Sequence, residues 1–105
     1  MTGASRRSAI GAAVVGRLVA DGAAVLVHSW AAADGERADV GGAEQLVGEL
    51  RAAGGTLAHV SADLADPDAP AQLVATAQEV LGRLDIVIAN HARSVRQSLE
   101  ELTAA

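Results

Sequence analysis

The chain has 105 residues, of which half are hydrophobic and one fifth are charged, and its formal net charge is −5. These values fit one small globular domain and exclude a disordered chain. The acidic balance argues against a nucleic-acid-binding surface, and no apolar run approaches the roughly 18 residues of a membrane span. The absence of cysteine excludes disulfides and thiolate metal sites and suits a reducing cytoplasm.

The first half of the chain alternates between helix and strand patterns. Ile10, Val14 and Leu18 recur at four-residue spacing and predict a helix of about three turns, which ends at Asp21 and Gly22. The short apolar run 24–28 predicts a strand. Residues 30–42 read as a loop. A helix carrying Leu46, Val47 and Leu50 on one face then leads to a second strand at 56–60.

The second half continues the alternation. Asp66 and Pro67 predict the N-cap and first turn of a helix, which Gly82 ends. Its predicted inward residues are Leu73, Val74, Ala77, Val80 and Leu81. The continuous apolar run 86–89 predicts a central strand buried on both faces, and residues 98–102 predict a helical turn. Repeated helix–strand alternation indicates an α/β fold with a parallel sheet of three strands.

The opening segment carries the first chemical signal. Residues 2–11, here called the glycine turn, lead into the N-terminus of the first helix, where free N–H groups and the helix dipole attract phosphate. The segment matches neither the G-x-G-x-x-G pattern nor a P-loop, so an ordinary capped helix remains the alternative. Arg6 and Arg7 before an apolar run also imitate a secretory signal, but Arg17 interrupts that run and a strand pattern follows directly.

Four segments together resemble the short-chain dehydrogenase/reductase family. The glycine turn resembles its T-G-x-x-x-G-x-G motif, with two additional residues and Ala9 in place of the middle glycine. Residues 62–64 resemble the segment whose Asp hydrogen-bonds adenine, which makes Asp63 the adenine candidate. Residues 84–92 resemble the strand that ends in N-N-A-G, of which only Asn90 is kept. Residues 98–103 resemble the segment before the subunit-interface helix, which implies a homo-oligomer for the full-length protein.

The resemblance implies a partial Rossmann-like, doubly wound parallel sheet whose first strand and C-terminal half are missing. Residues 1–105 are then a single partial dinucleotide-binding domain, truncated at both ends. The residues predicted to bind the cofactor are Gly3, Ser5, Arg6, Arg7, Ile10, Gly11, Ser29, Asp63, Leu64, Asn90, His91 and Ala92.

The choice between the two nicotinamide cofactors has a physical argument. An acidic residue after the second strand of such a fold would accept from the ribose hydroxyls of NAD and repel a 2′-phosphate, but Ser29 stands there. A guanidinium of Arg6 or Arg7 could pair with that phosphate, although solvated loop arginines are the alternative. The sequence therefore favours NADP over NAD.

The three histidines do not predict a metal site. His28, His59 and His91 are spaced by the length of the strand–helix repeat, and no cysteine accompanies them. His91 follows a predicted strand at the cofactor side, although a lone histidine there is more often structural.

Catalysis is predicted to lie outside this chain. Members of the family transfer hydride with a Ser and a Tyr-x-x-x-Lys pair, whereas this chain contains no tyrosine and no lysine. We therefore predict no catalytic residue here. The favoured reading is the cofactor-binding part of a cytoplasmic reductase or dehydrogenase acting on a carbonyl or alcohol, a 3-oxoacyl thioester included. A non-catalytic nucleotide-binding or interaction module is the alternative.

Overall fold

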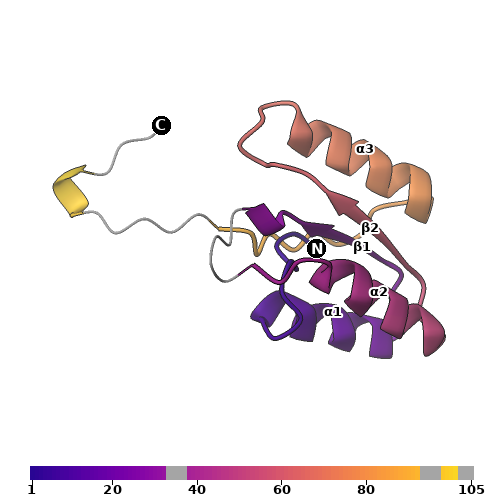
Figure 1. The fold of residues 1–105 in the computed structure, drawn as a ribbon. Coiled ribbons are helices and arrows are strands. Elements are labelled where there is room, and N and C mark those ends of the chain that lie inside the picture. Colours follow the sequence, from indigo (N-terminus) through magenta and orange to yellow (C-terminus); the bar gives the residue numbers. More distant parts are fainter. Residues whose placement is uncertain (33–37, 93–97, 102–105) are drawn as a thin grey trace.

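Two strands and three α-helices form the body of the domain (Figure 1). The computed structural model describes residues 1–32, 38–92 and 98–101. Along the chain lie α1 (Ile10–Ala20), β1 (Val25–Ser29), α2 (Gly42–Ala52), β2 (Leu57–Ser61), α3 (Ala69–Leu81) and the 3-10 helix η2 (Leu99–Glu101). Part of the predicted loop, at 33–37, and Leu102 of the predicted final turn lie outside the described residues.

The sheet is parallel and covered on both faces. Val25 of β1 is in register with Leu57 of β2, and all five residues of β1 are buried. Helices α1 and α2 lie on one face of the sheet and α3 on the other (Figure 1). The α/β class and the partial Rossmann-like fold are confirmed, and both strands begin one residue later than predicted.

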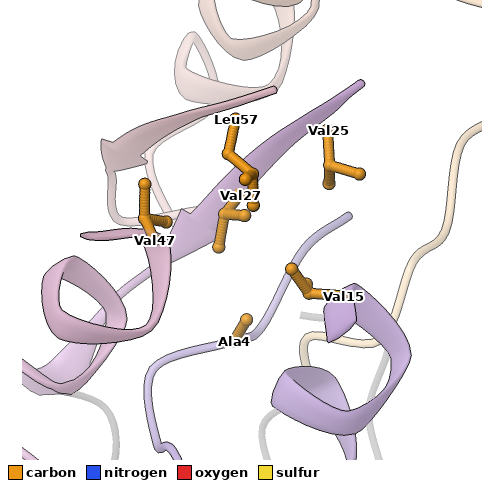
Figure 2. Close-up of a cluster of buried hydrophobic side chains, with 6 residues drawn as sticks. All are labelled: Ala4, Val15, Val25, Val27, Val47 and Leu57. Carbon is orange, nitrogen blue, oxygen red and sulfur yellow. The ribbon is translucent and has the colours of Figure 1, made fainter. Parts of the chain in front are cut away.

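The core is small because it is built from small side chains. Figure 2 shows the buried cluster between the strands and the helices α1 and α2. Its members are Ala4, Val15, Val25, Val27, Val47 and Leu57. Val15 and Val27 have no exposed surface at all. None of the helices in the described part of the chain has the length and apolar character that spanning a membrane requires.

The predicted start of α3 is wrong by two residues. Asp66 does not cap the helix; its carboxylate accepts from the Asp68 amide (2.9 Å) in the turn before it. Helix α3 begins at Ala69 with Asp68 at the N-cap, and Pro70 occupies its first turn. The local side-chain to backbone bond of Asp66 competes with helix formation, so the helix starts later.

The predicted third strand is absent from the described residues. Residues 86–89 adopt no regular secondary structure and pair with no strand, and Ile86 and Val87 are 67% and 68% exposed. Within the part of the chain that the structure describes, they have one backbone bond to another segment, from the Thr2 amide to the Ile88 carbonyl (2.9 Å). Without a paired strand on that side, an apolar run cannot be buried on both faces.

An apolar slot of about 600 Å³ separates β1 from this segment. It is lined by residues of β1, of α3 and of 84–88, among them Leu26, Leu73, Ala77 and Ile86. The predicted burial of Val74 and Val80 is wrong, since they are 44% and 53% exposed, and Val74 lines the open slot. Among the five predicted inward residues of α3 only Ala77 is fully buried.

Substitutions in the two apolar runs should differ in cost. We expect Val27→Ala to lower the free energy of unfolding by about 2 kcal/mol, because it removes buried methyl groups and leaves a cavity. Val87→Ala should change it by less than about 0.5 kcal/mol, because that side chain is largely solvated. Urea unfolding measures both. An equal loss in the two variants would show that residues 86–89 are buried.

Candidate functional site

A cleft of about 410 Å³ opens where the glycine turn meets the carboxyl ends of β1 and of residues 86–89. Its lining combines the turn, the first residues of α1 and two short segments that follow those ends. The lining residues are Gly3, Ser5, Arg6, Ser8, Ala9, Ile10, Gly11, Trp30, Asn90, His91 and Ala92. Eight of the twelve predicted cofactor residues therefore lie together in one cleft.

Two glycines allow backbone segments to approach closely at the floor of the cleft. Gly3 has a φ of +77°, and a Cβ there would lie 2.8 Å from His91 Cα. A Cβ on Gly11 would lie 2.5 Å from the Gly3 carbonyl oxygen and 3.2 Å from Asn90 Nδ2. Both positions thus require glycine, one for its conformation and both for space.

The Thr2 hydroxyl joins the glycine turn to residues 88–91. It accepts from the amides of Asn90 (3.1 Å) and His91 (3.2 Å) and donates to the Ile88 carbonyl (3.5 Å). Asn90 Nδ2 donates to the Gly3 carbonyl (3.1 Å). These bonds hold the two walls of the cleft together. Among the described residues positive φ occurs only at glycine, so Ala92 adopts an ordinary backbone conformation.

His28 supports the turn from below, buried at the end of β1 with 1% of its surface exposed. Its Nδ1 accepts from the Gly3 amide (3.2 Å), and its Nε2 lies 2.8 Å from the Ala62 carbonyl. This pair of bonds fixes the neutral tautomer with the proton on Nε2. Burial lowers the pKa of His28, and the bond to Ala62 opposes that shift. The ring of His91 packs edge-on against it, with centroids 5.5 Å apart.

The N-terminus of α1 faces the cleft with its amides available. Ala9 is the N-cap and provides no side-chain cap, and the first turn holds no acidic residue. Its opening residues, Ile10 and Gly11, line the cleft. Amides at a helix start lack intrahelical acceptors, so this arrangement suits an anion.

The other four predicted residues lie outside the cleft lining. Ser29 is buried, and its hydroxyl lies 2.7 Å from His59 Nε2. Asp63 is exposed, and its carboxylate accepts from the Ala65 amide (2.9 Å). Leu64 lines the apolar slot instead. The Arg7 side chain contacts α2.

Sequence reasoning missed three residues of the cleft, namely Ser8, Ala9 and Trp30. Trp30 follows β1 directly, and its amide donates to the Ser5 hydroxyl (3.0 Å). Its position at the carboxyl end of a parallel strand, where ligands of such sheets bind, could have identified it. In the described ranges no three His, Asp or Glu side chains gather in a way that could hold a metal ion.

Two glycine substitutions in α1 should act in opposite directions. Gly11→Ala should lower the free energy of unfolding by about 2 kcal/mol, because its Cβ meets the Gly3 carbonyl. Gly16→Ala is the control, since nothing lies within 4 Å of a Cβ there, and it should raise stability by about 0.5 to 1 kcal/mol. Urea titrations of the two variants test this, and a tolerated alanine at 11 would contradict the close approach.

Stability should fall as the pH drops below about 6.5, the ordinary value for histidine. Because the folded-state pKa of His28 is lowered, the unfolded chain binds the proton first, and stability is lost from that pH down to the lowered pKa. Protonated Nδ1 could no longer accept from Gly3. His28→Asn, which cannot titrate, should flatten the slope of urea midpoint against pH. Parallel slopes in both proteins would refute the role of His28.

Comparison with known proteins agrees with the geometry. The model of the short chain dehydrogenase family matches residues 1–105. The chain is 36% identical over 103 residues to an uncharacterized oxidoreductase of Methylorubrum extorquens, covering 98% of this chain and 38% of that protein. It is 38% identical over 90 residues to an L-rhamnose 1-dehydrogenase (NAD(P)(+)) of Azotobacter vinelandii, covering 86% and 33%. No solved structure matches.

The chain thus spans under two fifths of the length of these curated relatives. The family match extends over the whole chain and includes the glycine turn and the segment at Asn90 that form the cleft. The chain belongs to the short-chain dehydrogenase family.

Proposed function

We propose that this chain is the cofactor-binding N-terminal part of an NAD(P)-dependent oxidoreductase that transfers hydride to or from a carbonyl or alcohol. One observation carries the proposal. The start of α1, which bears no acidic side chain, faces the same cleft as Gly3 and Gly11 of the glycine turn, which have no Cβ atoms. This is a site for an anionic ligand that must approach the backbone closely, as a pyrophosphate does.

Within this proposal the chain's own residues bind and orient the dinucleotide. The amides of Ile10 and Gly11 meet the pyrophosphate, and Asn90, His91 and Ala92 form the wall opposite the turn. Ser29 is the last residue of β1, and Asp63 and Leu64 follow β2, at the end of the sheet where the adenosine half would lie. The nicotinamide supplies the hydride when it is bound.

NADP is the cofactor that we propose. Ser29 brings no negative charge to the end of β1, so nothing at that position repels a 2′-phosphate. Arg6 lines the cleft and offers a guanidinium fork that matches phosphate geometry. A cytoplasmic location and a homo-oligomeric full-length protein belong to the same proposal and rest on the family.

The substrate class is a carbonyl or alcohol compound. The sugar in the name of one relative and a 3-oxoacyl thioester both present such a group. The chain has no tyrosine and no lysine, so the proton donor that the family uses would have to come from outside these residues. We therefore expect the chain alone to bind the dinucleotide without catalysing a reaction. Measurable NADPH oxidation with any carbonyl compound would contradict this expectation.

Trp30, the single aromatic residue, gives a direct binding test. NADPH should quench its fluorescence in a saturable manner, because Trp30 lines the cleft. Arg6→Ala should weaken NADPH binding by roughly tenfold and leave NADH binding nearly unchanged, because a charged hydrogen bond is worth about 1.5 to 3 kcal/mol. Arg17→Ala, an exposed arginine of α1, is the control.

Equal losses for NADPH and NADH in Arg6→Ala would refute the 2′-phosphate role. Failure of the unaltered chain to bind either dinucleotide would refute the proposed function. The alternative, a non-catalytic interaction module, would then be favoured.

A further inference from the structure

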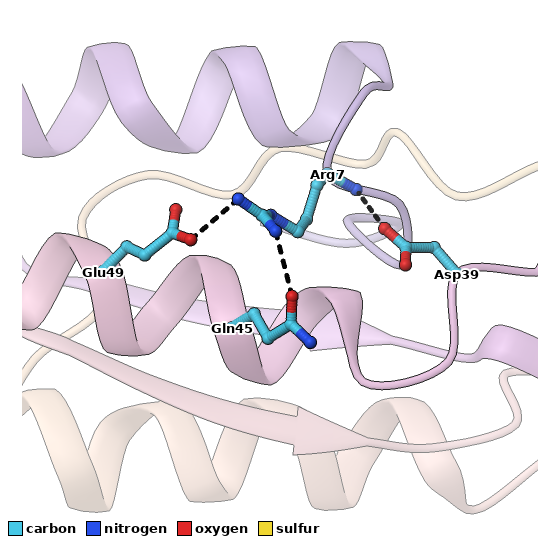
Figure 3. Close-up of polar contacts among 4 residues, drawn as sticks. All are labelled: Arg7, Asp39, Gln45 and Glu49. Atoms are coloured by element: carbon cyan, nitrogen blue, oxygen red, sulfur yellow. Dashed lines mark hydrogen bonds and ion pairs between the residues drawn. The ribbon is translucent and has the colours of Figure 1, made fainter.

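Arg7 is adjacent to Arg6 in sequence but serves a different surface. Its guanidinium donates from Nη1 to Gln45 Oε1 (2.9 Å) and from Nη2 to Glu49 Oε1 (2.7 Å), as Figure 3 shows. Its backbone amide donates to Asp39 Oδ2 (3.1 Å). Three hydrogen bonds thus tie one residue of the glycine turn to α2 and to Asp39, which lies three residues before that helix.

The three acceptors of Arg7 are well placed to hold it. Gln45 and Glu49 are four residues apart and so share one face of α2. Asp39 is fixed by the helix start, because its carbonyl accepts from the Gly42 amide (2.9 Å) and its carboxylate occupies the space that a Cβ on Gly42 would need. The planar fork of an arginine can reach both side chains of α2 at once, which a lysine ammonium does less well.

The glycine turn needs such an anchor. Between Ser5, which accepts from the Trp30 amide, and Ile10, where α1 begins, the described backbone has one bond within the turn, from the Ala9 amide to the Arg6 carbonyl (3.3 Å). Yet Arg6, Ser8 and Ala9 line the cleft on both sides of Arg7. A turn that must keep its shape for a ligand benefits from being held before the ligand arrives.

We propose that Arg7 is a positioning residue for dinucleotide binding, which holds the glycine turn on α2 so that Arg6 and the start of α1 keep one wall of the cleft in place. The inference rests on the proposed function and refines it. The two arginines have separate tasks: Arg6 meets the phosphate, and Arg7 contacts protein only. The ligand concerned is any nicotinamide dinucleotide, with or without a 2′-phosphate.

The test compares Arg7→Ala with Arg6→Ala in the 105-residue chain. Arg7→Ala should raise the dissociation constants of NADPH and NADH by the same factor, about threefold, because exposed ion pairs contribute modestly. Arg6→Ala should raise mainly the dissociation constant of NADPH. Amide hydrogen exchange of Arg6, Ser8 and Ala9 should become faster in Arg7→Ala. Arg17→Ala, which breaks the exposed pair with Asp21, should change neither readout.

Partner variants separate a positioning role from a general loss of stability. Glu49→Ala should reproduce part of the Arg7→Ala effect, and the double variant should not exceed Arg7→Ala alone, since both remove the same contact. Arg7→Lys should restore binding in part. The urea midpoint should move no more in Arg7→Ala than in Arg17→Ala.

A selective loss of NADPH binding in Arg7→Ala, or unchanged amide exchange in the turn, would overturn the proposal. If the unaltered chain binds no dinucleotide, the proposed function fails, while the exchange experiment still decides whether Arg7 holds the turn.

Discussion

The close contact between the glycine turn and residues 90–91 is the constraint on which the candidate site depends. The turn can lie there because Gly3 and Gly11 have no side chains. The Thr2 hydroxyl accepts from the Asn90 backbone amide, and the Asn90 side-chain amide donates to the Gly3 carbonyl, so these polar groups keep hydrogen-bond partners. His28, near the end of β1, completes the arrangement, because its Nδ1 accepts a hydrogen bond from the Gly3 amide. Any ligand in the cleft therefore meets a backbone surface whose shape is set before binding.

Much of the fold was predictable because its signals are local. Four-residue spacing of apolar residues identified α1, an apolar run identified β1, and both strands were placed to within one residue. The start of α3 and the state of residues 86–89 were not predictable in this way. The start of α3 depended on a hydrogen bond that the Asp66 side chain accepts. The state of residues 86–89 depended on which backbone segment lies beside them. Burial of Val74 failed for the same reason as the strand, since both need a neighbour across the slot.

The grouping of residues at the candidate site was predictable from the sequence, but their contacts were not. Of the twelve residues predicted from the family resemblance to bind the cofactor, eight line one cleft. The family motifs could not reveal that Trp30 lines it or that the Arg7 side chain turns away to α2, because both facts arise from tertiary packing. The i, i+4 spacing of Gln45 and Glu49 shows only that α2 offers a polar pair on one face. Adjacent arginines in a motif can thus have different roles, and only their surroundings distinguish them.

The bonds of Thr2 to residues 88–91 also bear on the order of folding. Each of them closes a loop of almost the whole chain, since Thr2 and Asn90 are 88 residues apart in sequence. Closing so long a loop costs more entropy than pairing β1 with β2, whose partners are 32 residues apart, although the cost grows only with the logarithm of length. During synthesis, the N-terminal residues must wait for Asn90 to leave the ribosome. We therefore expect the cleft to form late in folding, on a sheet that has already formed.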